Sequence, residues 1–203
     1  MSVEKKHSAS STISDFLTID EDRRFHELLG GEIVEKAAPS GEHGAAQSYL
    51  AARLIGPFSR RLGGHHPGGW WFATEVEIRF GKNVCRPDVA GWRRERVPDP
   101  PRGKMVDLLP DWTCEILSSD NARNDLVRKK HIYHEHRVGH YWIADPQQGV
   151  LLVYRWVADG YLEVLSAERG ERVRAEPFEA IELQVGTLFG DDEDENENQD
   201  GAR

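Results

Sequence analysis

The chain has 203 residues, of which 38% are hydrophobic and 30% are charged, and its formal net charge is −9. This length suits one domain with a hydrophobic core of its own. No run of about 18 apolar residues occurs, so we expect no membrane span. The N-terminal stretch MSVEKKHSASSTIS also lacks the apolar core of a secretory signal.

The acidic charge is concentrated at the C-terminus. Seven acidic residues and one arginine give the segment DDEDENENQDGAR a charge of −6, which leaves −3 for the other 190 residues. Because a mildly acidic protein can still bind phosphates through a local basic patch, this charge neither supports nor excludes a DNA partner. The only two cysteines, Cys85 and Cys114, fit reduced structural thiols and a cytoplasmic location.

Composition divides the chain into three segments. We expect a disordered Ser-rich arm at residues 1–15, a single domain at residues 16–190, and a disordered acidic tail at residues 191–203.

The expected elements of the domain alternate between helix and strand patterns. Residues 23–36 predict a short helical turn, a Gly-Gly turn and a strand. Apolar residues recur every fourth position from Ala46 to Leu62, which predicts a helix that Pro57 kinks or ends. Further strands are expected at 72–80, 83–92, 112–118, 140–145, 150–157 and 161–167, with a long loop at 93–110 and a helix at 121–139. This order predicts an α/β (α+β) fold, a central mixed sheet flanked by helices.

Two acidic residues lie inside apolar strand patterns, Asp88 in CRPDVAGW and Glu115 in WTCEILS. If their strands are neighbours, the two carboxylates meet, and at about 4 Å they repel by about 4 kcal/mol at an effective dielectric constant of about 20. A shared proton, a basic side chain or a divalent cation would offset that repulsion. Oxygen ligands favour Mg²⁺, which suits attack on a phosphodiester. The alternative for Asp88 is a solvated residue in a bulge at Pro87.

The helix after Glu115 offers a cation for the same site. Asp125, Lys129 and Tyr133 are spaced i, i+4 and i+8, so they share one side of that helix. Lys129 can then project back toward the end of the Glu115 strand. A solvated Asp125–Lys129 pair on an exposed face is the alternative interpretation.

An ordered set of motifs resembles a known family. RPDVAGW, WTCEILSS and NDLVRKKHIYHEHRVGHYWIADP, preceded by FHELLGGEIVEKAAPSGEH, are similar to the Uma2 family, also called DUF820, of the PD-(D/E)XK nuclease superfamily. The resemblance covers about residues 20 to 190. It implies a restriction-endonuclease-like core and metal-dependent cleavage of DNA by Mg²⁺ or Mn²⁺.

The resemblance also implies roles for particular residues. Asp88 and Glu115 match the metal-binding acids, and the main-chain carbonyl of Ile116 is an expected further ligand. The superfamily lysine would stand at Leu117, where this chain has none. The matching lysine comes instead from the next helix, as Lys129 or, as a second choice, Lys130.

Two earlier residues also match the family. Glu27 corresponds to its amino-terminal acid and His43 to its histidine near the start of the first helix. Gly30 and Ser119 depart from the usual residues beside the motifs. Both departures lie beside the motifs and not at the residues that carry the chemistry.

The sequence therefore leaves three alternative functions. The first is a Mg²⁺-dependent endonuclease acting on DNA, for which a homodimer would supply two active sites for two strands. The second, motivated by Leu117, is a nucleic-acid-binding module that has kept the fold and lost cleavage. The third is an interaction protein that binds a partner through its acidic tail.

Overall fold

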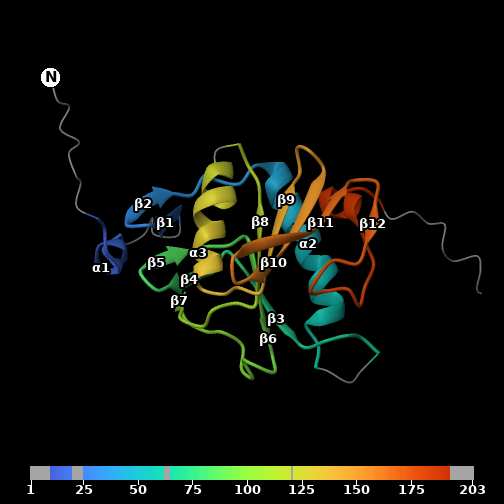
Figure 1. The fold of residues 1–203 in the computed structure, drawn as a ribbon, viewed down its shortest axis with the longest axis horizontal. Coiled ribbons are helices and arrows are strands. Elements are labelled where there is room, and N and C mark those ends of the chain that lie inside the picture. The colour runs from blue at the N-terminus through green and yellow to red at the C-terminus, as the bar shows by residue number, and fades with distance from the viewer. Residues whose placement is uncertain (1–9, 20–24, 62–64, 120, 193–203) are drawn as a thin grey trace, which may run out of the picture.

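The computed structural model describes residues 10–19, 25–61, 65–119 and 121–192 (Figure 1). Two mixed sheets, one of six strands and one of five, form the framework of this part of the chain. The larger has the strand order β11-β10-β9-β8-β6-β3 and the smaller has the order β2-β1-β5-β4-β7. The strands of the larger sheet are β3 (Trp70–Thr74), β6 (Val89–Arg93), β8 (Trp112–Ile116), β9 (His140–Asp145), β10 (Val150–Val157) and β11 (Gly160–Glu168). Those of the smaller sheet are β1 (His26–Leu29), β2 (Glu32–Glu35), β4 (Glu77–Phe80), β5 (Asn83–Cys85) and β7 (Met105–Val106).

The helices and a small third sheet complete the described fold. They are α1 (Ile13–Leu17), α2 (Gly41–Phe58), the π-helix η2 (Asn124–Lys129), α3 (Lys130–Glu135), the 3₁₀-helix η3 (Val185–Phe189), and the paired strands β12 (Arg172–Val173) and β13 (Leu183–Gln184). In the larger sheet only β8 and β9 pair in parallel, and the other neighbours are antiparallel. The prediction of a mixed sheet flanked by helices is therefore confirmed.

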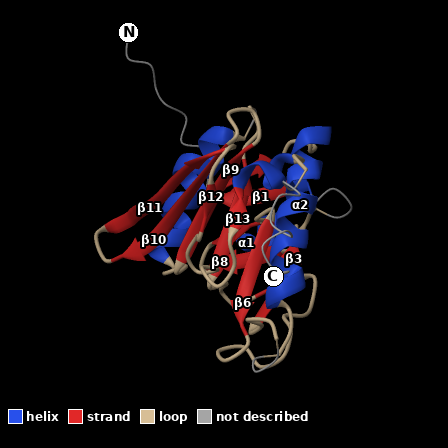
Figure 2. Ribbon diagram, turned by 90° about the vertical axis from the view of Figure 1, so that its right-hand side faces the viewer, coloured by secondary structure: helices blue, strands red, loops and turns tan. Residues whose placement is uncertain are grey.

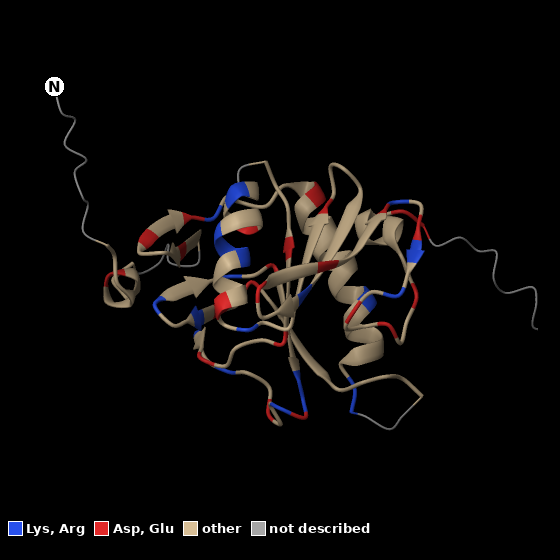
Figure 3. Cartoon of the chain, in the orientation of Figure 1, with Lys and Arg blue, Asp and Glu red and all other residues tan. Residues whose placement is uncertain are grey.

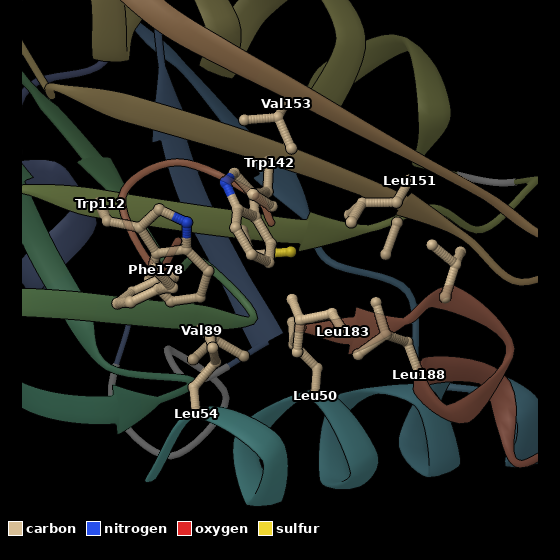
Figure 4. Packing of buried hydrophobic residues seen from close by; sticks show 14 of the residues in the cluster. Leu50, Leu54, Val89, Trp112, Trp142, Leu151, Val153, Phe178, Leu183 and Leu188 are labelled. Atoms are coloured by element: carbon tan, nitrogen blue, oxygen red, sulfur yellow. The ribbon is translucent and has the colours of Figure 1, made fainter. Parts of the chain in front are cut away.

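Helix α2 covers one face of the larger sheet (Figure 2). Ser40 caps its start by accepting a hydrogen bond from the His43 N–H at 3.2 Å. Of the residues expected to share one side, Ala46, Leu50, Leu54 and Phe58 are all buried, and Leu62 lies outside the described residues. They pack with Trp112 and Trp142 of the sheet and with the C-terminal segment around Leu183 and Leu188 (Figure 4). Pro57 lies in the last turn, and the helix ends one residue later.

The opposite face of the larger sheet packs against α3 and the smaller sheet. Ile132 and Tyr133 of α3 join a buried cluster with Ile143 of the larger sheet and Ile78 and Phe80 of the smaller one. Helices thus lie on both faces of the larger sheet, and the smaller sheet adds a further layer beside α3.

A bent ribbon joins the two sheets. Strands β3 and β6 pair in the larger sheet, and their continuations β4 and β5 pair in the smaller sheet. The chain crosses between the sheets at residues 75–76 and again at residues 86–88. At the first crossing Glu75 has a φ of 54°, an uncommon conformation for a residue other than glycine.

This corner corrects two predictions. The segments 72–80 and 83–92 are not single strands, because each is divided at the crossing. The residues after the corner resume a strand pattern, so the alternation in the sequence continues through the break. Pro87 was the visible signal of the division, since proline is confined to strand starts, edges and bulges.

Three smaller differences concern other elements. Residues 26–29 form strand β1, not a helical turn, because they pair with β2 across the Gly-Gly turn. The expected loop at 93–110 contains the short strand β7. The expected helix at 121–139 is a π-helix followed by an α-helix that ends at Glu135.

The structure also describes residues just outside the expected limits of the domain. Residues 13–15, assigned to the N-terminal arm, form the first turn of α1, which places Phe16 in the core. Asp191, assigned to the tail, accepts a hydrogen bond from Arg169 at 2.8 Å. The remaining tail residues, 193–203, lie outside the described part of the chain.

Candidate active site

Asp88 lies where the second crossing enters strand β6. Its side chain is 1% exposed. Oδ1 accepts a hydrogen bond from the Lys36 ammonium at 2.7 Å, and Oδ2 accepts one from the Ile116 N–H at 2.6 Å. Strands β6 and β8 pair Val89 with Cys114, so one step along the same register Asp88 faces Glu115. The two predicted acids therefore meet on neighbouring strands, and Asp88 is not a solvated bulge residue.

The first turns of α2 bring two polar side chains to the corner. His43 Nε2 lies 3.3 Å from Asp88 Oδ1. The Gln47 amide donates to the Asp88 main-chain carbonyl at 2.8 Å and to Glu75 Oε1 at 3.2 Å. The capped start of α2 thus positions His43, a predicted site residue, directly beside the predicted metal-binding acid.

His43, Glu75 and Asp88 form a group suited to a metal ion. One ligand atom from each lies within 4.8 Å of the other two. His43 Nδ1 is buried and has no hydrogen-bond partner among the described residues. Two carboxylates and an imidazole are ligands that divalent cations accept in proteins. The donor atoms at the corner therefore fit a divalent ion.

Glu115 lies beside this group but has different neighbours. Its Oε2 accepts from the Lys129 ammonium at 3.0 Å and its Oε1 accepts from the Tyr133 hydroxyl at 2.6 Å. Lys129 also lies 3.1 Å from Glu27 Oε1 and 3.0 Å from Asp125 Oδ1. One lysine is thus surrounded by three carboxylates, and the side of the helix predicted from the i, i+4 spacing faces the site rather than solvent.

The structure separates the two candidate lysines. Lys129 is 1% exposed and contacts Glu115. Lys130 points elsewhere, with its ammonium 3.5 Å from the centre of the Tyr154 ring. Of the two, only Lys129 belongs to the site.

Glu27 connects the site to the main chain of the corner. Its Oε1 accepts a hydrogen bond from the Arg86 N–H at 2.6 Å. The Arg86 side chain in turn donates to Glu77 at 2.7 Å and to the Glu75 carbonyl at 2.6 Å. These bonds link the two crossings of the ribbon, because Glu75 and Arg86 belong to different crossings.

Burial and neighbouring charges shift the pKa values of the two acids in opposite directions. Burial alone would raise the pKa of Asp88, but Lys36 and His43 hold it well below its ordinary value. Burial raises the pKa of Glu115 well above its ordinary value, and the nearby Asp125 carboxylate adds to the effect. Asp88 is therefore ionised in the fold, whereas the Glu115 carboxyl retains a proton more readily.

Two hollows open beside His43, one of about 300 Å³ and one of about 270 Å³. Ala38 and His43 line both of them. The first extends along Leu117 and Ser118, at the end of strand β8, and the second reaches Lys36 and Glu75. The ligand group is therefore accessible from outside through the α2 side of the corner.

All five side chains predicted as site residues, Asp88, Glu115, Lys129, Glu27 and His43, belong to this connected buried network. For Ile116 the observed contact is its N–H to Asp88, and the ligand role of its carbonyl stays a prediction. Sequence reasoning missed Lys36, Glu75 and Gln47. Glu75 belonged to an alternating strand pattern, and no spacing motif connected Lys36 to Asp88.

The family relationship is decided by a match over most of the chain. The model of the Uma2 family, described as "Putative restriction endonuclease", matches residues 13–186. The chain belongs to the Uma2 family. This confirms the resemblance in the motifs around Asp88, Glu115 and Lys129.

Among solved structures, the chain resembles a "putative nuclease belonging to DUF820" from Anabaena variabilis, with a TM-score of 0.69 and 24% identity. The match covers 88% of this chain and 97% of that chain. No curated protein matches. At this identity the likeness establishes the fold alone.

Proposed function

We propose that this Uma2 chain is a Mg²⁺-dependent endonuclease that hydrolyses phosphodiester bonds in DNA, with Mn²⁺ as an alternative ion. The observation that carries the proposal is the group of His43, Glu75 and Asp88 ligand atoms within 4.8 Å of one another. Membership of a family described as "Putative restriction endonuclease" supports it.

The proposed ligand set extends the one expected from sequence. Asp88 is its centre, with Glu115 on the facing strand and the Ile116 carbonyl as the expected further ligands, and Glu75 and His43 are added. A bound divalent ion would withdraw charge from the phosphate and lower the pKa of the attacking water. Asp88 is suited to hold the ion because its carboxylate stays ionised in the fold.

The nearby side chains would orient the ligands of the ion. Hydrolysis forms a bond from a water oxygen to phosphorus and breaks a bond from phosphorus to an ester oxygen. We assign the water proton to solvent, which reaches the site through the hollow lined by Glu75 and Gln47, because Glu75 itself would be a ligand of the ion. Lys129, surrounded by Glu27, Glu115 and Asp125, would orient Glu115. A direct role of Glu27 toward metal or water stays a prediction.

Cleavage of supercoiled plasmid DNA tests the proposal. The parent should nick or linearise the plasmid with Mg²⁺ and lose that activity when the ion is chelated. Asp88→Asn should be inactive, because it removes the central carboxylate charge. Asp107→Asn, a control in an exposed pair with Arg79, should cleave like the parent. A parent that binds DNA and metal without cutting would contradict the proposal.

That contradictory outcome defines the second candidate function, a nucleic-acid-binding module without cleavage. The observation that favours it is Leu117, which stands where the superfamily lysine is expected. Metal binding and DNA binding by the parent, with no cleavage by the parent or by either variant, would support this module instead.

Location and assembly remain parts of the proposal. In the described residues no helix is long and apolar enough to cross a membrane. Cys85 and Cys114 are both buried and free, which suits the proposed cytoplasmic location. The homodimer stays a prediction, to be tested by the mass of the particle in solution.

A further inference from the structure

Lys36 follows strand β2 directly and reaches into the corner. Its side chain is 10% exposed. The ammonium lies 2.7 Å from Asp88 Oδ1, 3.0 Å and 2.8 Å from the two Glu75 carboxylate oxygens, and 3.0 Å from the Arg86 main-chain carbonyl. One cationic group is therefore surrounded by four oxygen acceptors.

These acceptors include the ligand atoms of the proposed metal site. Asp88 Oδ1 faces both the Lys36 ammonium and His43 Nε2. Carboxylate and main-chain carbonyl oxygens are what hard divalent cations coordinate. A divalent ion bound by Asp88 and Glu75 would need the oxygens that Lys36 now holds, so the ammonium and the ion compete for them.

We propose that Lys36 is an internal cation that holds the ligand group together before a metal binds, and that the entering divalent ion displaces it. The inference rests on the proposed metal site. Without either cation, Asp88 and Glu75 would repel each other across the corner. Lys36 therefore keeps the ligands assembled and at the same time weakens metal binding.

The displaced side chain has space beside the site. Lys36 lines the hollow of about 270 Å³ together with Phe25, Pro39 and Gln47. Neither Glu115 nor Lys129 lines this hollow. A rotation about the flexible lysine stem would move the ammonium from the carboxylates into this space without moving the main chain.

Calorimetric titration with Mn²⁺ tests the competition. Lys36→Met removes the competing charge while keeping a flexible, unbranched side chain one heavy atom shorter. In the metal-free parent, we take the fraction of molecules with Lys36 withdrawn from the carboxylates to be about a tenth or less. The variant should then bind Mn²⁺ at least about tenfold more tightly than the parent. Lys36→Arg, which keeps a cation, and Lys82→Met, which removes an exposed lysine, should not tighten binding. Equal or weaker Mn²⁺ binding by Lys36→Met would overturn the proposal.

A second measurement uses the unaltered chain. Acetylation of each lysine by acetic anhydride, followed by peptide mass spectrometry, reports how accessible its amine is. Adding Mg²⁺ should accelerate acetylation of Lys36 and leave exposed Lys82 unchanged. An unchanged Lys36 rate at Mg²⁺ concentrations that saturate the site would contradict displacement.

The outcomes separate this inference from the nuclease proposal. If the parent binds Mn²⁺ without cutting DNA, the nuclease proposal is contradicted. The Mn²⁺ affinities of the parent and Lys36→Met then still decide whether Lys36 competes with the ion. A parent that cuts DNA, with Lys36→Met binding Mn²⁺ no more tightly, contradicts only the role of Lys36.

Discussion

Lys129 is the residue whose environment departs most from that of an ordinary lysine. It is buried, and its ammonium is shared by Glu27, Glu115 and Asp125. Burial alone would lower the pKa of Lys129, but these carboxylates raise it well above its ordinary value. The ammonium therefore stays charged in the core, and the carboxylates around it depend on that charge.

Removing this charge should destabilise the fold. In Lys129→Met the three carboxylates lose their common cation, and breaking such a buried pair costs about 3 kcal/mol or more. Urea unfolding in the presence of a chelator measures the loss. Lys130→Met is the matched control, because the ammonium of that neighbour lies over the Tyr154 ring, an interaction worth about 0.5–1 kcal/mol. Similar losses in both variants would contradict the account of Lys129.

Residues to which the family resemblance assigns a role could be predicted from the sequence, and residues without an assigned role could not. Asp88, Glu115 and Lys129 each belong to a run that resembles the family, so their convergence was expected. Lys36 and Glu75 meet Asp88 only because the chain bends between two sheets. No fixed spacing in the sequence encodes that bend, and long-range placement of single polar residues depends on it.

At the scale of elements, helix α2 and the bent ribbon together build the site. The ribbon provides Glu75 and Asp88 at its two crossings, and α2 provides His43 and Gln47 from its first turns. The buried side of α2, predicted correctly from its spacing, attaches the helix to the larger sheet. The fold class could be predicted because such periodic patterns are strong. The division of the ribbon could not, since both halves alternate like strands.

The attachment of α2 should depend on Leu54. This side chain is 0% exposed, whereas the adjacent Ile55 is 41% exposed. Leu54→Ala should lower the free energy of unfolding by about 3 kcal/mol, through lost burial and the cavity left behind. Ile55→Ala should cost less than about 1 kcal/mol, since that side chain removes little surface from water. Denaturant unfolding of both variants checks this, and a larger loss for Ile55→Ala would refute the packing described for α2.

At the scale of the whole molecule, charge is distributed unevenly between the domain and the tail. Figure 3 shows acidic and basic positions interspersed over the described fold. The segment 193–203 carries five acidic residues and one arginine, a charge of −4 out of the total of −9. An acidic segment of this kind repels DNA phosphates or competes with them for basic side chains.

Deleting residues 193–203 should therefore strengthen DNA binding. We expect an increase in affinity at low ionic strength that becomes smaller at about 0.15 M salt, where the screening length is about 8 Å. Fluorescence anisotropy with a labelled duplex, in the presence of a chelator to prevent cleavage, measures both conditions. If the shortened chain binds more weakly, the tail contributes to DNA binding. The same deletion tests whether the tail binds a partner protein. If the shortened chain recovers the same partners in a pull-down as the full chain does, the tail does not have that role.

The central claim is that the corner around Asp88 binds a divalent cation, and Mn²⁺ binding to Asp88→Asn tests it most directly. Calorimetry should show one site in the parent and in the exposed control Asp107→Asn. In Asp88→Asn the affinity should fall by at least about tenfold, since one lost charge–charge interaction of about 1.4 kcal/mol already gives that factor. Parent-like binding of Mn²⁺ by Asp88→Asn would contradict the account.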